Sequence, residues 1–313
     1  MVTTEFYDDT SSSDAAYALA IQADGKIIAA GSAGAFTRYN TDGSVDLSFG
    51  DAGHVDFTSI ARDIAVQDDG KILVAGTGFG LKRYNSDGSL DATFGDGGTV
   101  HFSVGKGTAI GYSLAIQDDG RIVVAGTWTK SNDSALMIVR YNVDGTLDNT
   151  FDSDGILTFA FEGDETDVTS VALQDDGKIV VAGCVGESLD QDFLVVRCNS
   201  DGSMDNTFGD LGIVRTDFEG ERDLANSVAI QSDGKIVLAG WAYSDFKGRS
   251  ALARYNIDGA LDTTFDTDGK AITDLLPLTT DDCAYGMVIQ PDGQIALAGK
   301  SSDDFAVVRY NSD

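Results

Sequence analysis

A short apolar segment recurs six times along the chain, each time beside an Asp-Gly turn. The stretch AIQDDGRIVVAGT begins at Ala115, and near-copies begin at Ala20, Ala65, Ala172, Ala229 and Val288. Its second half, IVVA, is apolar at every position and rich in β-branched residues, which favours a strand over a helix. A run that is apolar on both faces is typical of a strand covered by sheets on both sides. The pattern therefore predicts an all-β fold made of one repeated unit.

Each copy predicts four strands, which in the fourth copy are 170–174, 178–183, 193–199 and 213–218. The links between them are short and carry Asp-Gly, which suits antiparallel hairpins. Four-stranded antiparallel units repeated about every 45–59 residues are the signature of propeller blades. Six copies therefore predict a six-bladed β-propeller, because a closed ring of blades buries the faces that one blade leaves open.

We expect residues 1–313 to form one propeller domain. The predicted blades are 17–59, 62–104, 112–161, 169–218, 226–276 and 285–311. The last of these has only three strands, and the N-terminal stretch 2–6 (VTTEF) matches the fourth strand 214–218 (VRTDF) of another blade. We therefore predict that residues 2–6 complete the sixth blade and close the ring.

The charge of the chain narrows its possible partners. With 51 acidic residues against 21 Lys plus Arg, the formal net charge is −30. This charge argues against nucleic-acid binding, which needs a basic surface, and against anionic membranes. No apolar run reaches the roughly 20 residues of a membrane-spanning helix, and no signal peptide is visible. The three cysteines are expected to be buried free thiols, because strand geometry puts Cys184 and Cys198 at opposite edges of one sheet.

Two polar groups recur with the strands. An Arg ends each third strand, and the Asp of a following Leu-Asp (Val-Asp in the first copy, Met-Asp in the fourth) accompanies it five times. The Arg residues are Arg38, Arg83, Arg140, Arg197, Arg254 and Arg309, and the Asp residues are Asp46, Asp91, Asp148, Asp205 and Asp262. Recurrence in every blade predicts a structural ion pair rather than a ligand site that must exist once. The repeated Gln-x-Asp-Gly segments are predicted to be turns capped by the Asp side chain, with Gly in the left-handed conformation.

One Asp-rich turn is a candidate calcium site. The segments FDSDG and FDTDG place Asp152 with Asp154 and Asp266 with Asp268. Clustered carboxylates suit Ca²⁺, a hard cation that takes oxygen ligands. The rest of an EF-hand loop is missing, so a solvated Asp-Gly turn is the alternative interpretation.

The spacing between the second and third strands varies. From the Ala-Gly glycine to the Arg there are 7 residues in copies one and two, 14 in copies three to five and 10 in copy six. We interpret the extra residues as enlarged loops on one face, where binding residues usually lie. They carry aromatic and cationic side chains that suit a glycan or a protein segment: Trp128, Lys130, Trp241, Tyr243, Phe246, Lys247 and Arg249. The alternative is that the two tryptophans only cap the packing of the blades.

The order Q-x-D-G-K-I-V-V-A-G … R-Y-N-x-D-G-x-L-D-x-x-F-G-x-x-G resembles the delta-60 repeat family of bacterial secreted and surface proteins. The resemblance covers essentially the whole chain; Cys198 replaces the repeat Tyr, and Gln294 replaces the repeat Lys. It implies a β-propeller, an extracellular or cell-surface location and membership of a larger modular chain. It brings no catalytic residue.

Catalytic motifs are missing: the chain has only two His and no G-x-S-x-G, His-Glu-x-x-His or phosphate-binding glycine loop. We therefore expect a non-catalytic binding or adhesion module whose ligand face lies on blades three to five. One alternative is a structural spacer or surface-assembly subunit braced by calcium. The other is a metal-dependent lactonase or lyase, for which Asp63 and Asn226 are the plausible inward ligands.

Overall fold

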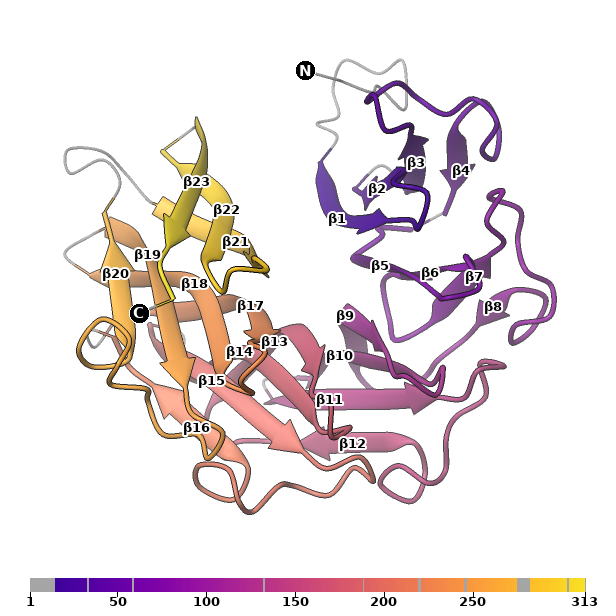
Figure 1. Cartoon of the computed structure of the whole chain (residues 1–313). Helices are drawn as coiled ribbons and strands as arrows, with labels where there is room; N and C mark the ends of the chain where they lie inside the picture. Colours follow the sequence, from indigo (N-terminus) through magenta and orange to yellow (C-terminus); the bar gives the residue numbers. More distant parts are fainter. Residues whose placement is uncertain are drawn as a thin grey trace. The chain divides into compact units, whose positions relative to one another are not determined.

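The structure, a computed structural model, describes residues 15–32, 34–57, 59–131, 133–187, 189–218, 221–244, 247–274, 282–302 and 304–312. These residues form strands, bridges and turns, and no helix that could span a membrane occurs among them. They build six antiparallel sheets, which we number as blades one to six along the chain (Figure 1).

The first three blades each have four strands in the described residues. Blade one contains β1 (Ala16–Ile21), β2 (Ile27–Gly31), β3 (Ala35–Tyr39) and β4 (His54–Asp56). Blade two contains β5 (Asp63–Val66), β6 (Ile72–Ala75), β7 (Leu81–Tyr84) and β8 (Thr99–Val100). Blade three contains β9 (Thr108–Ile116), β10 (Ile122–Lys130), β11 (Asp133–Tyr141) and β12 (Ile156–Phe159).

Blades four and five repeat this order, while blade six has three described strands. Blade four contains β13 (Glu165–Leu173), β14 (Ile179–Glu187), β15 (Asp190–Cys198) and β16 (Ile213–Thr216). Blade five contains β17 (Asp223–Ile230), β18 (Ile236–Ser244), β19 (Lys247–Tyr255) and β20 (Lys270–Thr273). Blade six contains β21 (Asp282–Ile289), β22 (Ile295–Ser301) and β23 (Asp304–Tyr310). The segment 2–6, predicted as its fourth strand, lies outside the described residues.

The chain divides into two compact units. The first comprises Met1–Trp128 and Ile138–Asn149, and the second comprises Thr129–Met137 and Thr150–Asp313. In the first unit, blades one and two enclose a core that includes Phe36, Phe49 and Tyr84; the Phe36 and Tyr84 rings meet edge to face at 5.0 Å. Each unit thus holds packed pairs of blades.

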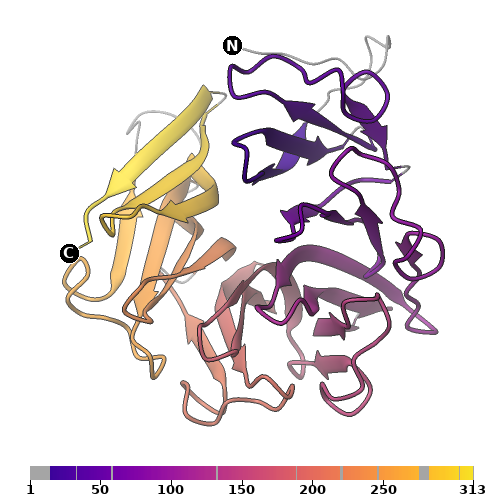
Figure 2. The same ribbon diagram turned by 45° about the vertical axis from the view of Figure 1, so that its right-hand side comes forward.

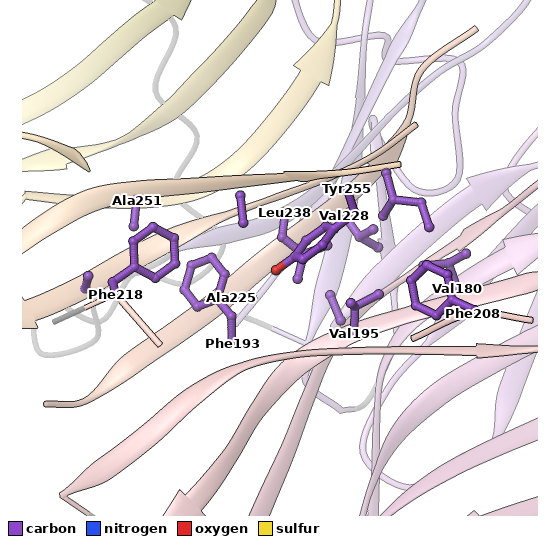
Figure 3. Close-up of a cluster of buried hydrophobic side chains, with 14 residues drawn as sticks. Val180, Phe193, Val195, Phe208, Phe218, Ala225, Val228, Leu238, Ala251 and Tyr255 are labelled. Carbon is purple, nitrogen blue, oxygen red and sulfur yellow. The ribbon is translucent and has the colours of Figure 1, made fainter. Parts of the chain in front are cut away.

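In the second unit, blade five is covered on both faces, as its apolar second strand predicts. Ile236 and Leu238 of β18 pack toward Phe193 and Val195 of blade four (Figure 3). The alternate residues Val237 and Ala239 pack toward blade six. Blades four and five lie side by side in both ribbon views (Figure 1 and Figure 2). The apolar strand β18 therefore contributes side chains to two cores, one on each of its faces.

The glycine permits a close backbone approach to the first strand in five of the six Ala-Gly pairs. In blade five the register passes from Ala225 opposite Gly240 to Ser227 opposite Ala239, so Asn226 is the extra residue of a β-bulge. A Cβ atom on Gly240 would lie 1.9 Å from the carbonyl oxygen of Leu224. The glycines that would meet a backbone oxygen at 1.8–1.9 Å in this way are Gly31, Gly126, Gly183, Gly240 and Gly299. No side chain fits there, which explains why the pair recurs.

The Asp-Gly turns have the predicted structure. In the turn of blade four, Asp176 Oδ1 accepts the amide of Lys178 at 3.2 Å, and Gly177 has a φ of 82°. The same Asp-to-amide hydrogen bond forms in every described Gln-x-Asp-Gly turn. These aspartates therefore have a structural role, as the repeat pattern predicts.

The predicted Arg–Asp pairs are also confirmed, and four of the arginines do more than bind an aspartate. Nε of Arg197 donates to Asp205 Oδ2 at 2.7 Å, and both side chains are almost fully buried. Nη1 of the same guanidinium donates to the carbonyl oxygen of Ile257, in the next blade, at 2.7 Å. Equivalent bonds lead from Arg38, Arg83 and Arg254 to the carbonyls of Ser86, Val143 and Ser312. We call this arrangement the arginine staple, because it fastens one blade to its successor.

The three cysteines are buried thiols without a disulfide bond, as expected. Cys184 lies opposite Phe193 and Cys198 lies opposite Ile179, so the two thiols are at different ends of the β14–β15 ladder. Burial raises the pKa of the Cys184 thiol to about 12.

Candidate functional site

The extra residues of blades three to five form longer strands, so their interpretation as enlarged loops is wrong. β10, β11, β14, β15, β18 and β19 each have 9 residues, against 4 or 5 in the middle strands of blades one and two. In blade four the pairing runs without interruption to Glu187 opposite Asp190. The added residues stay in the ladder because they are partly apolar and both faces of β14 are covered there; the consecutive residues Cys184 and Val185 have no exposed surface. Three blades therefore carry long hairpins, which we define as 122–141, 179–198 and 236–255.

The candidate binding residues lie on these hairpins, and most belong to the third. Trp241 and Tyr243 of β18 stack edge to face, with ring centroids 6.1 Å apart. They occupy alternate positions with Val237 and Ala239, so they continue the face that packs toward blade six. This placement fits the alternative in which Trp241 caps the packing of the blades.

The cationic candidates have partners of their own or lie on another hairpin. Arg249 Nη1 donates to Ser244 Oγ at 2.9 Å, and Lys247 Nζ lies 4.0 Å from Asp274 Oδ2. Trp128 is half-buried and Lys130 exposed, both in β10. Phe246 lies outside the described residues. The structure thus groups Trp241, Tyr243, Lys247 and Arg249 on one hairpin, whereas Trp128 and Lys130 belong to that of blade three.

A pocket of about 700 Å³ lies within the second unit, at the tips of the hairpins of blades three and four. Its third wall is the segment 160–165, which leads into β13. The amide of Thr166 donates to Ser134 Oγ at 2.6 Å and holds this segment against the tip of the blade-three hairpin. The volume lies within the range of roughly 300–1,000 Å³ that is usual for ligand sites.

The lining of this pocket, which we call the acidic pocket, is dominated by carboxylates. Its acidic lining residues are Asp133, Glu162, Asp164, Glu165, Glu187 and Asp190. Arg215 Nη2 lies 2.7 Å from Asp164 Oδ2 and offsets one of these charges. Leu189, which is 85% exposed, adds an apolar side chain at the rim. Such a lining attracts a cationic ligand.

The acidic pocket is not among the sequence-based predictions, which rest on the aromatic and basic residues of the hairpins. The signal was present in the acidic tips and in the run EGDETD at 162–167. What could not be read from the chain is that this run lies beside two hairpin tips.

The two inward polar residues expected for an enzyme join neighbouring blades. Asp63 Oδ2 accepts the amide of Leu114 at 2.8 Å and the hydroxyl of Ser113 at 3.0 Å. Burial raises the pKa of this carboxyl. Asn226 Nδ2 donates to the carbonyl of Ala284 at 2.8 Å. Both side chains therefore have structural partners between first strands.

The aspartates of the predicted calcium turns also take part in local hydrogen bonds. Asp154 Oδ1 accepts the amide of Ile156, and Asp268 Oδ1 accepts the amide of Lys270, each at 2.9 Å. Asp152 and Asp266 adopt positive φ values of 41° and 42°. Across the described part of the chain, the one group of three carboxylates within ligand distance lies elsewhere, at Asp192, Asp217 and Asp223.

The repeated four-stranded blades, the double-faced cores and the staples define the class of protein: a six-bladed β-propeller. The chain matches the family described as "Domain of unknown function (DUF5122) beta-propeller" at six places, and it belongs to that family. The matched residues are 22–49, 67–94, 117–151, 174–208, 231–265 and 290–313. A propeller repeat family is therefore confirmed, while the delta-60 name stays a resemblance.

Solved structures support the same fold. A protein of unknown function from Bacteroides caccae aligns with a TM-score of 0.54 at 13% identity, over 91% of this chain and 89% of that one. A protein of unknown function from Dyadobacter fermentans DSM 18053 gives 0.54 at 12% identity, over 95% and 93%. The WD40 beta propeller domain of Doa1 gives 0.53 at 14% identity, over 95% and 78%. No curated protein matches the sequence of the chain.

Proposed function

We propose that this propeller is a non-catalytic binding module of a secreted or cell-surface bacterial protein, and that it captures a basic segment of another protein. The observation that carries the proposal is the acidic pocket, where six carboxylates surround about 700 Å³ at two hairpin tips. A Lys- or Arg-rich segment is the ligand whose charge and length suit such a lining. The resemblance to delta-60 repeats supports the location at the cell surface.

The long hairpins support a binding role because they add surface only to some blades. Blades one and two form their sheets with middle strands of only 4 or 5 residues. The added length in blades three and four supplies Asp133, Glu187 and Asp190 to the pocket. Acidic tips on extended hairpins contribute nothing to the core, so a partner is the physical reason we assign to them.

The test uses a fluorescein-labelled octalysine peptide and fluorescence anisotropy at 150 mM salt. The pocket variant combines Asp133→Asn, Glu162→Gln and Glu187→Gln, three exposed residues of the lining. We expect its affinity to fall at least tenfold.

A matched control separates the pocket from the net charge of −30. The control variant combines Asp68→Asn, Asp118→Asn and Asp175→Asn, which are exposed in the Gln-x-Asp-Gly turns and remove the same charge. We expect its affinity to stay within twofold of the parent protein. Equal losses in the two variants would mean diffuse attraction, and the pocket proposal would be abandoned.

A further inference from the structure

Three aspartates meet where blade four ends and blade five begins. Asp192 lies in β15, Asp217 directly follows β16, and Asp223 opens β17. Each offers a carboxylate oxygen, and these oxygens lie within 4.8 Å of one another. We call this group the aspartate triad.

Strand register explains the convergence. Phe193 of β15 pairs with Thr216 of β16, so Asp192 and Asp217 occupy the positions just beyond this pair on adjacent strands. The amide of Phe218, the residue after Asp217, donates to Asp223 Oδ2 at 2.8 Å. The rings of Phe193 and Phe218, which are chain neighbours of Asp192 and Asp217, meet edge to face at 4.8 Å and fix the backbone at this corner (Figure 3). A rigid framework therefore holds three acids together.

Asp223 is the member that points to a ligand. Asp223 has no exposed surface, and its Oδ1 has no hydrogen-bond partner among the described residues. An unsatisfied buried carboxylate oxygen is costly, since it has lost water without gaining a donor. A cation at the triad would satisfy the orphan oxygen and offset the repulsion between the three acids.

Basic side chains close to the triad make hydrogen bonds directed elsewhere. Arg215 binds Asp164 at 2.7 Å, and Arg222 Nε donates to Gln191 Oε1 at 2.8 Å. Lys270 Nζ donates to the backbone carbonyl of Asp217 at 3.1 Å. These contacts leave the buried oxygen of Asp223 without a protein cation.

We propose that the aspartate triad binds a calcium ion through one carboxylate each from Asp192, Asp217 and Asp223. Calcium–oxygen distances of about 2.3–2.6 Å place two ligands of one ion at most about 5 Å apart, which the triad satisfies. An all-oxygen set without His or Cys suits a hard cation. Calcium takes 6–8 oxygens, so water fills the remaining positions on the exposed Asp217 side. This site is separate from the turns at 152–154 and 266–268.

The first experiment is isothermal titration of the metal-free chain with calcium chloride, together with thermal melts in calcium and in chelator. We expect one ion per chain and a melting midpoint about 5 °C higher at calcium concentrations well above Kd. Magnesium at the same concentration should raise the midpoint less, because it holds its water more tightly.

Variants locate the ion. Asp192→Asn, Asp217→Asn and Asp223→Asn should each weaken calcium binding at least tenfold. Asp217→Asn separates loss of the calcium site from loss of the fold, because this exposed residue can change without a cost to the core. The matched controls Asp152→Asn and Asp268→Asn change the turn aspartates and should leave binding unaltered.

Two results would overturn the proposal. One is the absence of calcium binding to the parent chain at 5 mM calcium. The other is calcium binding that survives in all three triad variants. If calcium binding is instead lost in Asp152→Asn or Asp268→Asn, the ion belongs to the turns. Peptide capture is measured with different variants and a different probe, so either proposal can fail without the other.

Discussion

Arg197 of blade four donates a hydrogen bond to the backbone carbonyl of Ile257 in blade five, 2.7 Å away. The same guanidinium binds Asp205 at 2.7 Å and lies over the ring of Phe208, with its carbon 4.3 Å from the ring centroid. One side chain thus joins a strand, a loop, an aromatic ring and the next blade. Such an arrangement makes its loss costly, because several buried groups lose their partners together.

Replacement of Arg197 by Met should lower the free energy of unfolding by about 3–5 kcal/mol, because it leaves the buried carboxylate of Asp205 unpaired. The double variant Arg197→Met with Asp205→Leu should lose less, since no charge is then buried alone. Guanidinium denaturation of the three proteins measures both quantities. Asp176→Asn is the control: its pair with Lys178 is exposed and worth about 0–1 kcal/mol. A loss below about 1 kcal/mol for Arg197→Met would show that the arginine staple contributes little to the stability of the fold.

The stability should fall in acid through aspartates such as Asp46. The hydroxyl of Ser48, with Lys26 and then Arg38, holds the pKa of this carboxyl well below its usual range. The unfolded chain therefore binds a proton more readily, and the stabilisation that is present at neutral pH is lost as the pH falls below about 4. Asp46→Asn should be less stable at pH 7 and should show a flatter loss between pH 4 and pH 2. Denaturation at a series of pH values checks this, and parallel curves for the two proteins would contradict it.

Gly240→Ala should strongly destabilise the chain. The new Cβ would meet the carbonyl oxygen of Leu224 at 1.9 Å, so the bulge and its bonds to the next blade must shift. We expect a loss of several kcal/mol, at the upper end of single substitutions. Gly286→Ala in blade six is the matched control, since its Cβ would meet nothing within 4 Å and its φ is not positive. Similar melting midpoints for both variants would contradict the role given to the Ala-Gly pair.

The three thiols should be inert in the folded protein. Cys184 and Cys198 have no exposed surface and Cys283 has 8%, and burial raises the pKa of Cys184 to about 12. A thiolate is the reactive form, so a disulfide reagent at pH 8 should modify none of them within minutes. All three should react in guanidinium. One rapidly titrating thiol in the native protein would show that the cores open more easily than the packing indicates.

Much of the fold could be predicted from the sequence, because each repeated residue has a local cause. Asp176 and Gly177 define a turn by their own chemistry, and the run at 179–182 needs cover on both faces whatever surrounds it. The staple aspartates could be predicted from recurrence alone. The partner of Arg197 in the next blade could not, because it accepts through a backbone carbonyl that any residue supplies.

The candidate site was harder to predict, since it depends on neighbours that are distant in the chain. The stretch CVGESLDQDFL at 184–194 looked like a loop because its polar residues interrupt an apolar pattern. Glu187 and Asp190 stand at the exposed end of a ladder whose other end is buried and apolar, and the two residues pair with each other. A prediction of the aspartate triad requires the register of β15 against β16, and this register cannot be read from residue spacing in the sequence.

The backbone acceptor of the arginine staple affects how a gene that encodes these repeats can change. Ser86, Val143, Ile257 and Ser312 offer the same carbonyl with unrelated side chains. At this contact one copy can therefore follow another without a compensating substitution. Unequal recombination between copies yields a chain with one repeat more or fewer in which the arginine of the new junction still finds a backbone carbonyl. Blade number is thereby open to change in one genetic event, while loss of part of a repeat leaves an arginine without its acceptor.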